Sequence, residues 1–162
     1  MKKSGFTIIE LLIYIALLSG FILILGQLFF SILDTQLESQ ANSAVDSEGQ
    51  YLLARLDYDI RRASSLTTPA TLGQSGSVLT LNIGGTAYTY SLTGSNLELT
   101  VSGNALPLNS QNIFVTGFTV RRLGNPDPAK PSVLIDISIS SQTVSLRQTS
   151  QSRNYQISVN LP

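Results

Sequence analysis

The chain has 162 residues, with ten basic and ten acidic side chains and with neither cysteine nor histidine. The balanced charge gives no general attraction to nucleic acid or to acidic surfaces. The missing residue types exclude disulfides, thiol nucleophiles, Cys/His zinc sites and Ser-His-Asp triads. In chain order, we predict a leader at 1–5, an apolar helix at 6–33, an amphipathic continuation at 34–63 and a strand-rich domain at 64–162.

The helical segment contains an uncharged apolar stretch, LLIYIALLSGFILILGQLFFSIL, at 11–33. A helix needs about 20 apolar residues to cross a bilayer, so this stretch predicts a membrane span. Lys2 and Lys3 precede it, and Asp34 and Glu38 follow it. Because positive charge stays in the cytoplasm, we expect a single pass through the inner membrane with the N-terminus in the cytoplasm.

Residues 34–63 carry one apolar stripe with steps of three or four residues, interrupted at Glu48 and Gly49. This pattern indicates an amphipathic helix. Pro69 and the Ser, Thr and Gly residues around it predict the end of the helix. A helix over 6–63 is about 85 Å long, so we expect half of it in lipid or against other copies. The stripe consists of Leu37, Ala41, Ala44, Val45, Leu52, Leu53, Leu56 and Ile60.

The C-terminal region switches to a period of two, which predicts antiparallel strands. Gly-Gly at 84–85 predicts a hairpin, and a second turn at 93–95 extends it to a three-stranded meander. Gly117 is an expected bulge or point of close approach. A sheet with one apolar face needs a cover, which the helix stripe supplies. We therefore predict an α+β fold, a long N-terminal helix packed on an antiparallel sheet, with strands at 77–83, 86–92, 96–102, 113–123, 132–140 and 155–161 and a loop at 124–131.

The first residues, KKSGFTIIE at 2–10, form a motif around a glycine. A secretory signal is cut after its apolar core, whereas the expected break here, Gly5–Phe6, lies before the core. The stretch resembles the prepilin signal of type IV pilins and type II secretion pseudopilins, a short basic leader and Gly, then Phe-Thr-x-x-Glu ahead of an apolar helix. Every element is present: Lys2, Lys3, Gly5, Phe6, Thr7 and Glu10.

The resemblance implies that a prepilin peptidase cuts after Gly5 and that the new amino group of Phe6 is methylated. It also implies storage in membrane lipid, followed by assembly with other pilin or pseudopilin subunits on an inner-membrane platform. In that assembly Glu10 neutralises the N-terminal amine of a neighbouring subunit. Independently, a carboxylate in an apolar span costs about 2.5–3.5 kcal/mol near the helix centre, so it is normally paired. The alternative is that Glu10 reaches water at the headgroup level.

The rest of the chain resembles the J-type minor pseudopilins and the related large minor pilins. In those proteins a helix that ends in an Asp-Ile-Arg-x-Ala-like stretch precedes a sheet domain. Asp59, Ile60, Arg61 and Ala63 occupy those places here. The sheet domain is compact for that class, so a major pilin or another minor class stays open. The resemblance implies a structural role without catalysis or a cofactor.

Three helix arginines, Arg55, Arg61 and Arg62, are candidates for a contact with DNA or a protein partner. We expect instead that they form surface ion pairs with Asp57 and Asp59. Nucleic acid is therefore an alternative partner without further support.

In the strand region, the alternation predicts which way the side chains of two residue pairs face. In an alternating strand only one of Arg121 and Arg122 faces inward, and we expect the other to be an exposed edge charge that blocks strand addition. Tyr88 and Tyr90 share one face of their strand, and we expect them to pack in the core.

Two alternative functions remain. The first is a membrane-tethered binding module, adhesive or DNA-binding, that joins no filament. The second is an exported enzyme with a signal anchor, which the lack of histidine, cysteine and paired carboxylates disfavours. Asp127, with Asn125 beside it, is a candidate calcium ligand, but calcium requires six or more oxygen atoms, so we predict no metal site.

Overall fold

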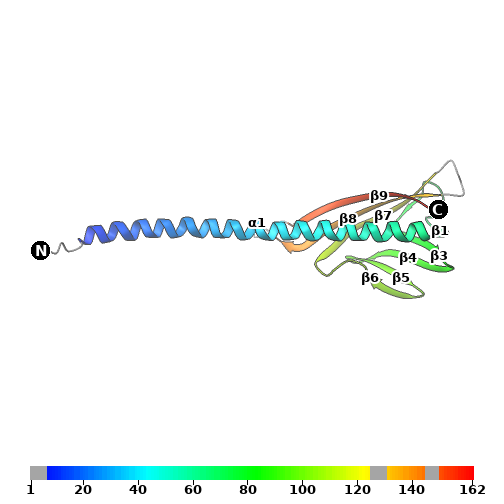
Figure 1. Cartoon of the computed structure of the whole chain (residues 1–162), viewed down its shortest axis with the longest axis horizontal. Helices are drawn as coiled ribbons and strands as arrows, with labels where there is room; N and C mark the ends of the chain where they lie inside the picture. Colours follow the sequence, from blue (N-terminus) through cyan, green and yellow to red (C-terminus); the bar gives the residue numbers. More distant parts are fainter. Residues whose placement is uncertain (1–6, 125–130, 145–149) are drawn as a thin grey trace.

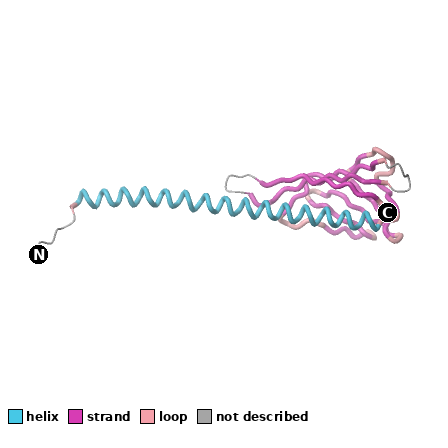
Figure 2. Tube along the Cα trace, turned by 45° about the horizontal axis from the view of Figure 1, so that its top comes forward, coloured by secondary structure: helices cyan, strands magenta, loops and turns pink. Residues whose placement is uncertain are grey.

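A computed structural model describes residues 7–124, 131–144 and 150–162. These residues form one helix, α1 (Ile8–Arg62), and two antiparallel sheets, so the fold is α+β as predicted (Figure 1). The C-terminal half of α1 lies along the sheets, and its N-terminal half extends beyond them (Figure 2). The strands are β1 (Ser65–Thr68), β2 (Ser75–Gly76), β3 (Val78–Ile83), β4 (Thr86–Thr93), β5 (Asn96–Val101), β6 (Asn104–Pro107), β7 (Ile113–Leu123), β8 (Ser132–Val144) and β9 (Ser150–Asn160).

The ends of α1 have separate local causes. Thr7 is the N-cap residue, and its Oγ1 accepts a hydrogen bond from the backbone N–H of Glu10 at 3.4 Å. At the other end Ala63 is extended, and the Ser64 N–H donates to the Asn82 carbonyl at 2.8 Å. The helix therefore ends where pairing with β3 begins. Our expectation that Pro69 and its neighbours end the helix is wrong, although the predicted bounds agree within two residues.

The strands divide between two sheets, with orders β1-β3-β4-β5-β6 and β2-β7-β8-β9. The predicted meander is confirmed as β3, β4 and β5. Gly84 and Gly85 form its first turn with φ of 58° and 82°, values that favour glycine. The expectation of a single sheet is wrong, because β7, β8 and β9 pair with β2 instead of with the meander.

The bulge predicted at Gly117 in β7 is confirmed. The pairing with β8 shifts between Val115 and Gly117, which is the irregularity of a bulge. A Cβ at Gly117 would lie 3.3 Å from Ser138 Oγ, so the side chain of its partner on β8 lies close to this position.

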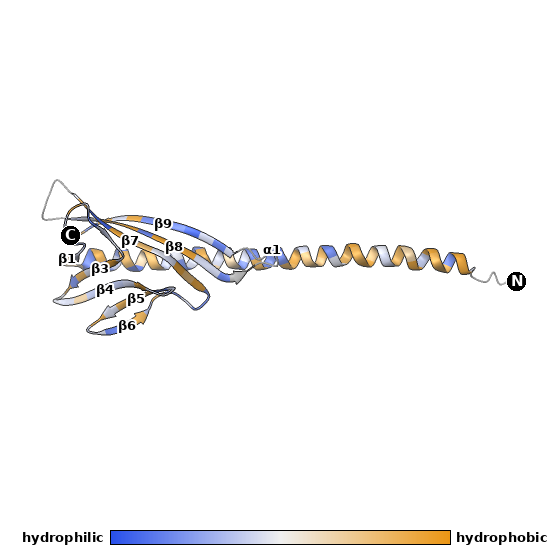
Figure 3. Ribbon diagram, turned by 180° about the vertical axis from the view of Figure 1, so that it is seen from behind, coloured by the Kyte–Doolittle hydropathy of each residue, from blue (hydrophilic) through white to orange (hydrophobic). Residues whose placement is uncertain are grey.

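The core lies between α1 and the two sheets. The helix packs mainly on β8 and β9 and also contacts β3 and β7. The buried residues of α1 all lie between Ala41 and Ile60, in the half that runs along the strands (Figure 3). Complete burial of a Leu or Ile side chain contributes about 1.5–3 kcal/mol. Of the predicted stripe, Leu37, Ala44 and Leu53 are half-buried, and Ala41, Val45, Leu52, Leu56 and Ile60 are buried.

The interruption of the stripe has a structural explanation. Gly49 is buried, and a Cβ there would overlap the ring of Tyr155 in β9. Beside it, Glu48 Oε1 accepts a hydrogen bond from the Ser110 N–H at 2.8 Å. The two residues that break the apolar pattern therefore make room for the Tyr155 ring and form a polar contact with the loop before β7.

Candidate functional site

The main candidate site is the N-terminal half of α1, which the sheets do not cover. Its large apolar side chains, from Ile8 to Ile32, are between 47% and 83% exposed. The helix is long and apolar enough to cross a membrane, and its most apolar window has no buried residue. Such a surface requires lipid or other apolar helices around it.

Two hydroxyl groups of this half of the helix have partners within it. Ser19 Oγ donates to the Ile15 carbonyl at 2.8 Å, and Thr35 Oγ1 donates to the Ser31 carbonyl at 2.9 Å. Bonds of this kind satisfy a hydroxyl without water, so these residues are compatible with apolar surroundings.

Glu10 lies in the first turn of α1, three residues after the N-cap Thr7. Thr-x-x-Glu is the spacing of a capping box, and an acid in the first turn interacts favourably with the helix dipole. We did not identify Thr7 as the N-cap from the sequence, although this spacing was the available signal. The cleavage and leader residues Lys2, Lys3, Gly5 and Phe6 lie outside the described residues.

A buried polar cluster joins α1 to β4. Asp59 is completely buried, and its Oδ2 accepts hydrogen bonds from Arg55 Nε at 2.9 Å and from the hydroxyl of Tyr90. Its Oδ1 has no partner among the described residues. Burial raises the pKa of the Tyr90 hydroxyl, and the bond to the Asp59 carboxylate adds to the increase. Burial alone lowers the pKa of Arg55, but Tyr90 and Asp59 together raise it.

The predictions for the helix charges are confirmed in part. Arg55 pairs with Asp59, and Arg61 pairs with Asp57 at 2.8 Å. Asp59 is not a surface charge, however, because the sheet domain covers it. Arg62 pairs with no acid in the described part of the chain and instead lies 4.8 Å from the ring centroid of Tyr58.

The predictions for the tyrosine pair and for the arginine pair in the strands have different outcomes. Tyr88 and Tyr90 both pack in the core, as predicted. Arg121 is exposed and Arg122 faces inward, where its Nη1 donates to the Ala70 carbonyl at 2.7 Å. The expected edge role of Arg121 is wrong, because β7 pairs with β2 on one side and with β8 on the other.

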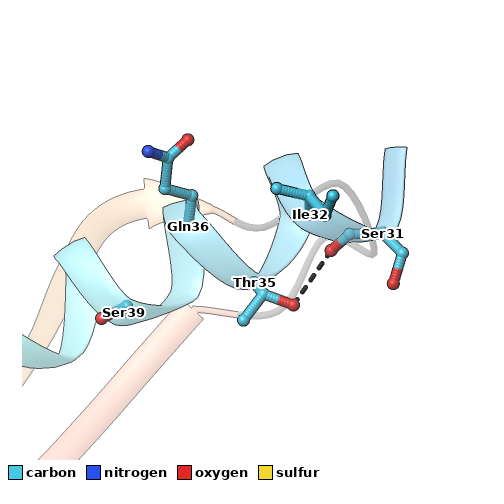
Figure 4. A pocket seen from close by; sticks show the side chains of 5 residues that line it. All are labelled: Ser31, Ile32, Thr35, Gln36 and Ser39. Atoms are coloured by element: carbon cyan, nitrogen blue, oxygen red, sulfur yellow. Dashed lines mark hydrogen bonds between the residues drawn. The ribbon is translucent and has the colours of Figure 1, made fainter. Parts of the chain in front are cut away.

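An open hollow of about 420 Å³ lies on α1 where the sheets begin, as Figure 4 shows. Small polar side chains dominate the described part of its lining, in which no residue is charged or aromatic: Ser31, Ile32, Thr35, Gln36 and Ser39. A ligand site normally combines apolar walls with a few convergent polar groups, so the hollow gives no indication of a ligand.

The described residues contain no group of three or more His, Cys, Asp or Glu side chains that could hold a metal ion. The calcium candidates Asp127 and Asn125 lie outside those residues.

The pKa of Tyr90 predicts an alkaline instability that depends on this residue. A tyrosine in the unfolded chain loses its proton near pH 10, whereas folded Tyr90 keeps its proton to higher pH. The folded state then binds more protons, so this stabilisation is complete below pH 10 and is lost as the pH rises through the folded pKa. We expect the Tyr90→Phe variant to show a shallower loss of thermal stability between pH 9 and 11, measured by circular dichroism. An unchanged slope would contradict this, and Tyr58→Phe, an exposed position, is the control.

Comparison with known proteins gives no match to a family model, a curated protein or a solved structure.

Proposed function

We propose that the chain is a structural subunit, of the minor class, of a type IV pilus, a type II secretion pseudopilus or a competence pseudopilus. It is processed at Gly5–Phe6 and assembles through its N-terminal helix. The supporting observation is the division of α1 into two halves. The first half exposes a continuous apolar surface, and the second half is the spine of a folded sheet domain. A helix of this kind is inserted in lipid before assembly and packs against the helices of other subunits afterwards.

The motif at 2–10 supplies the remaining support, because it places a cleavage site directly before the exposed helix. Cleavage there removes Lys2 and Lys3 and leaves the apolar surface on the mature subunit. A carboxylate then lies one helical turn from the new terminus, at Glu10. An N-terminal amine of a neighbouring subunit is the cation that this carboxylate pairs with in the proposed filament.

The processing step is tested by the mass of the chain extracted from membranes of its native cells. We expect a mature chain that begins at Phe6 and carries one additional methyl group on its amino nitrogen. A Gly5→Leu variant should retain the full leader, because the cut depends on the small residue before it. A mature chain that retains Met1–Gly5 would contradict the proposal and favour the membrane-tethered binding module.

The assembly role of Glu10 is tested by Glu10→Ala and Glu10→Gln. Both variants should be cut and inserted normally, because the leader and the apolar surface are unchanged. A hydrogen bond to a charged group contributes about 1.5–3 kcal/mol, so incorporation into filaments should fall by about tenfold or more. The control is Asp57→Asn, a partly exposed acid on the same helix. Filament fractions are compared by immunoblotting of sheared material, and normal incorporation of both Glu10 variants would count against the pairing role.

A further inference from the structure

β9 is the outer strand of its sheet and has one edge without a strand beside it in the described part of the chain (Figure 1). Side chains along β9 are mostly hydrophilic (Figure 3), and most of its residues are exposed. Unpaired N–H and C=O groups on such an edge are a template for another strand.

The register of β9 identifies the backbone groups that face this edge. The Leu161 N–H donates to the Pro131 carbonyl at 3.0 Å, and the same register continues from Asn160 to Ser152. Hydrogen-bonded and non-hydrogen-bonded pairs alternate along an antiparallel ladder, so the odd-numbered residues direct their N–H and C=O groups toward β8. The even-numbered residues direct theirs toward the free edge: Ser152, Asn154, Gln156, Ser158 and Asn160.

The other edges of the two sheets carry features that hinder strand addition. β2 has two residues and pairs only with Val120 and Arg121 of β7; along the rest of that edge β7 carries the register shift beside Gly117, and the Val115 N–H donates to the Ser95 carbonyl at 2.9 Å. β1 contains a register shift and is followed by Pro69. At β6 the Leu108 N–H donates to the Leu97 carbonyl at 2.8 Å, so the same alternation turns Pro107, which has no N–H, toward the free edge. Short strands, bulges and prolines are the usual protection of sheet edges. From 152 to 160, β9 has no proline, lysine or register shift.

An inward-pointing charged side chain also protects a sheet edge from strand addition, but Arg153, the charged residue of β9, is already paired with an acid on α1. Arg153 Nη1 lies 2.9 Å from Asp46 Oδ1 on α1, and the Tyr155 hydroxyl donates to the same oxygen at 3.0 Å. Gln151 Nε2 donates to Glu38 Oε1 at 3.4 Å. The side of α1 next to β9 therefore presents two carboxylates, Glu38 and Asp46, and one of these two negative charges is balanced by Arg153.

We propose that the free edge of β9 binds an extended strand of a different protein. This strand runs antiparallel to β9, as every neighbouring pair in this sheet does, and carries a lysine or arginine on the side that faces Glu38 and Asp46. Main-chain hydrogen bonds supply the affinity, and the side chains beside α1 supply the selectivity. The inference concerns the sheet domain and does not rest on the proposed filament role.

The test places a photoreactive amino acid at Ser152, Asn154, Gln156 or Ser158 of the full chain in its native cells. Cross-linked peptides are then sequenced by mass spectrometry. We expect all four positions to reach one segment of one partner. Successive positions along β9 should reach residues two apart in reverse order, which is the signature of an antiparallel ladder. The control positions are Thr116 and Thr119, exposed residues of β7, which β8 separates from β9, and they should give no cross-link to this segment.

Asn154→Pro is a second test, because it removes one outward N–H and no bond to β8. With the photoreactive group at Ser158, its cross-linking yield should fall by about tenfold or more, since proline on an edge blocks pairing. Thermal melting of the same variant reports whether the sheet domain is folded. The cross-linking pattern of the first test is measured without the proline and therefore stands even if this variant does not fold. Absent or scattered cross-links, cross-links to another copy of this chain, or a folded proline variant with unchanged yield would overturn the proposal.

Discussion

Replacement of Asp59 by Ala should lower the free energy of unfolding by about 3 kcal/mol, the lower end of the range for breaking a buried ion pair. The substitution leaves the buried hydroxyl of Tyr90 without its acceptor and removes the partner of Arg55. Arg55 is 37% exposed and still reaches water, which is why the upper end of the range is not expected. Thermal unfolding of the full chain in detergent micelles, followed by the near-ultraviolet circular dichroism of tyrosine, should show a midpoint about 6–12 °C lower.

The matched control is Asp57→Ala, which removes the partner of Arg61 two residues away. That pair is exposed, at 63% for Arg61 and 30% for Asp57, and exposed ion pairs contribute little to stability, so we expect a much smaller effect. Asp59→Leu combined with Tyr90→Phe should recover part of the lost stability, because it replaces the polar cluster by apolar contacts. Equal effects of the two alanine variants would show that burial of Asp59 does not determine its contribution.

The helix and the strands can be predicted from the sequence where a local pattern repeats over many residues. The apolar run at 11–33, the stripe from Ala41 to Ile60 and the alternation at 78–101 each specify one element over many residues. The turn at 84–85 requires positive φ at two positions, and only glycine adopts this without strain. These elements were predicted with bounds that agree within about two residues.

The missed features depend on contacts between distant residues. β6 has no buried position and therefore no alternation, although Ser102-Gly103, with φ of 51° and 84°, was an available turn signal. The division into two sheets depends on which strands pair, and alternation does not encode this. The role of Asp59 was missed for the same reason, because its partner Tyr90 lies 31 residues away.

The same limit applies to the candidate site. Exposure of the N-terminal half of α1 follows from composition alone, since no other segment of the chain is apolar enough to cover it. The edge of β9 is different. Its free N–H and C=O groups are determined by the pairing of β9 with β8, and the side chains from 152 to 154, which precede the predicted strand, are polar residues that would also suit a loop.

Gly49→Ala should lower the free energy of unfolding by about 2 kcal/mol, although alanine is the better helix former. A Cβ at this position would overlap the ring of Tyr155, and both residues lie in regular elements that resist displacement. Overpacking of this kind costs up to about 3 kcal/mol, and the gain in helix propensity returns about 1 kcal/mol. Thermal unfolding of the full chain in micelles measures the net effect, and Gly26→Ala, where a Cβ meets no atom within 4 Å, is the control.

The sign of this effect should reverse when the ring is removed. In a Tyr155→Ala background the added Cβ meets open space, so Gly49→Ala should stabilise the chain by about 0.5–1 kcal/mol through helix propensity alone. The coupling energy between the two positions is then about 3 kcal/mol, at the upper limit for residues in direct contact. Destabilisation of the same size in both backgrounds would mean that the glycine serves the backbone of α1 and not the approach of β9. Because Tyr155 also donates to Asp46, the Tyr155→Phe background separates the two groups: destabilisation by Gly49→Ala that persists there would show that the ring, and not its hydroxyl, requires glycine at position 49.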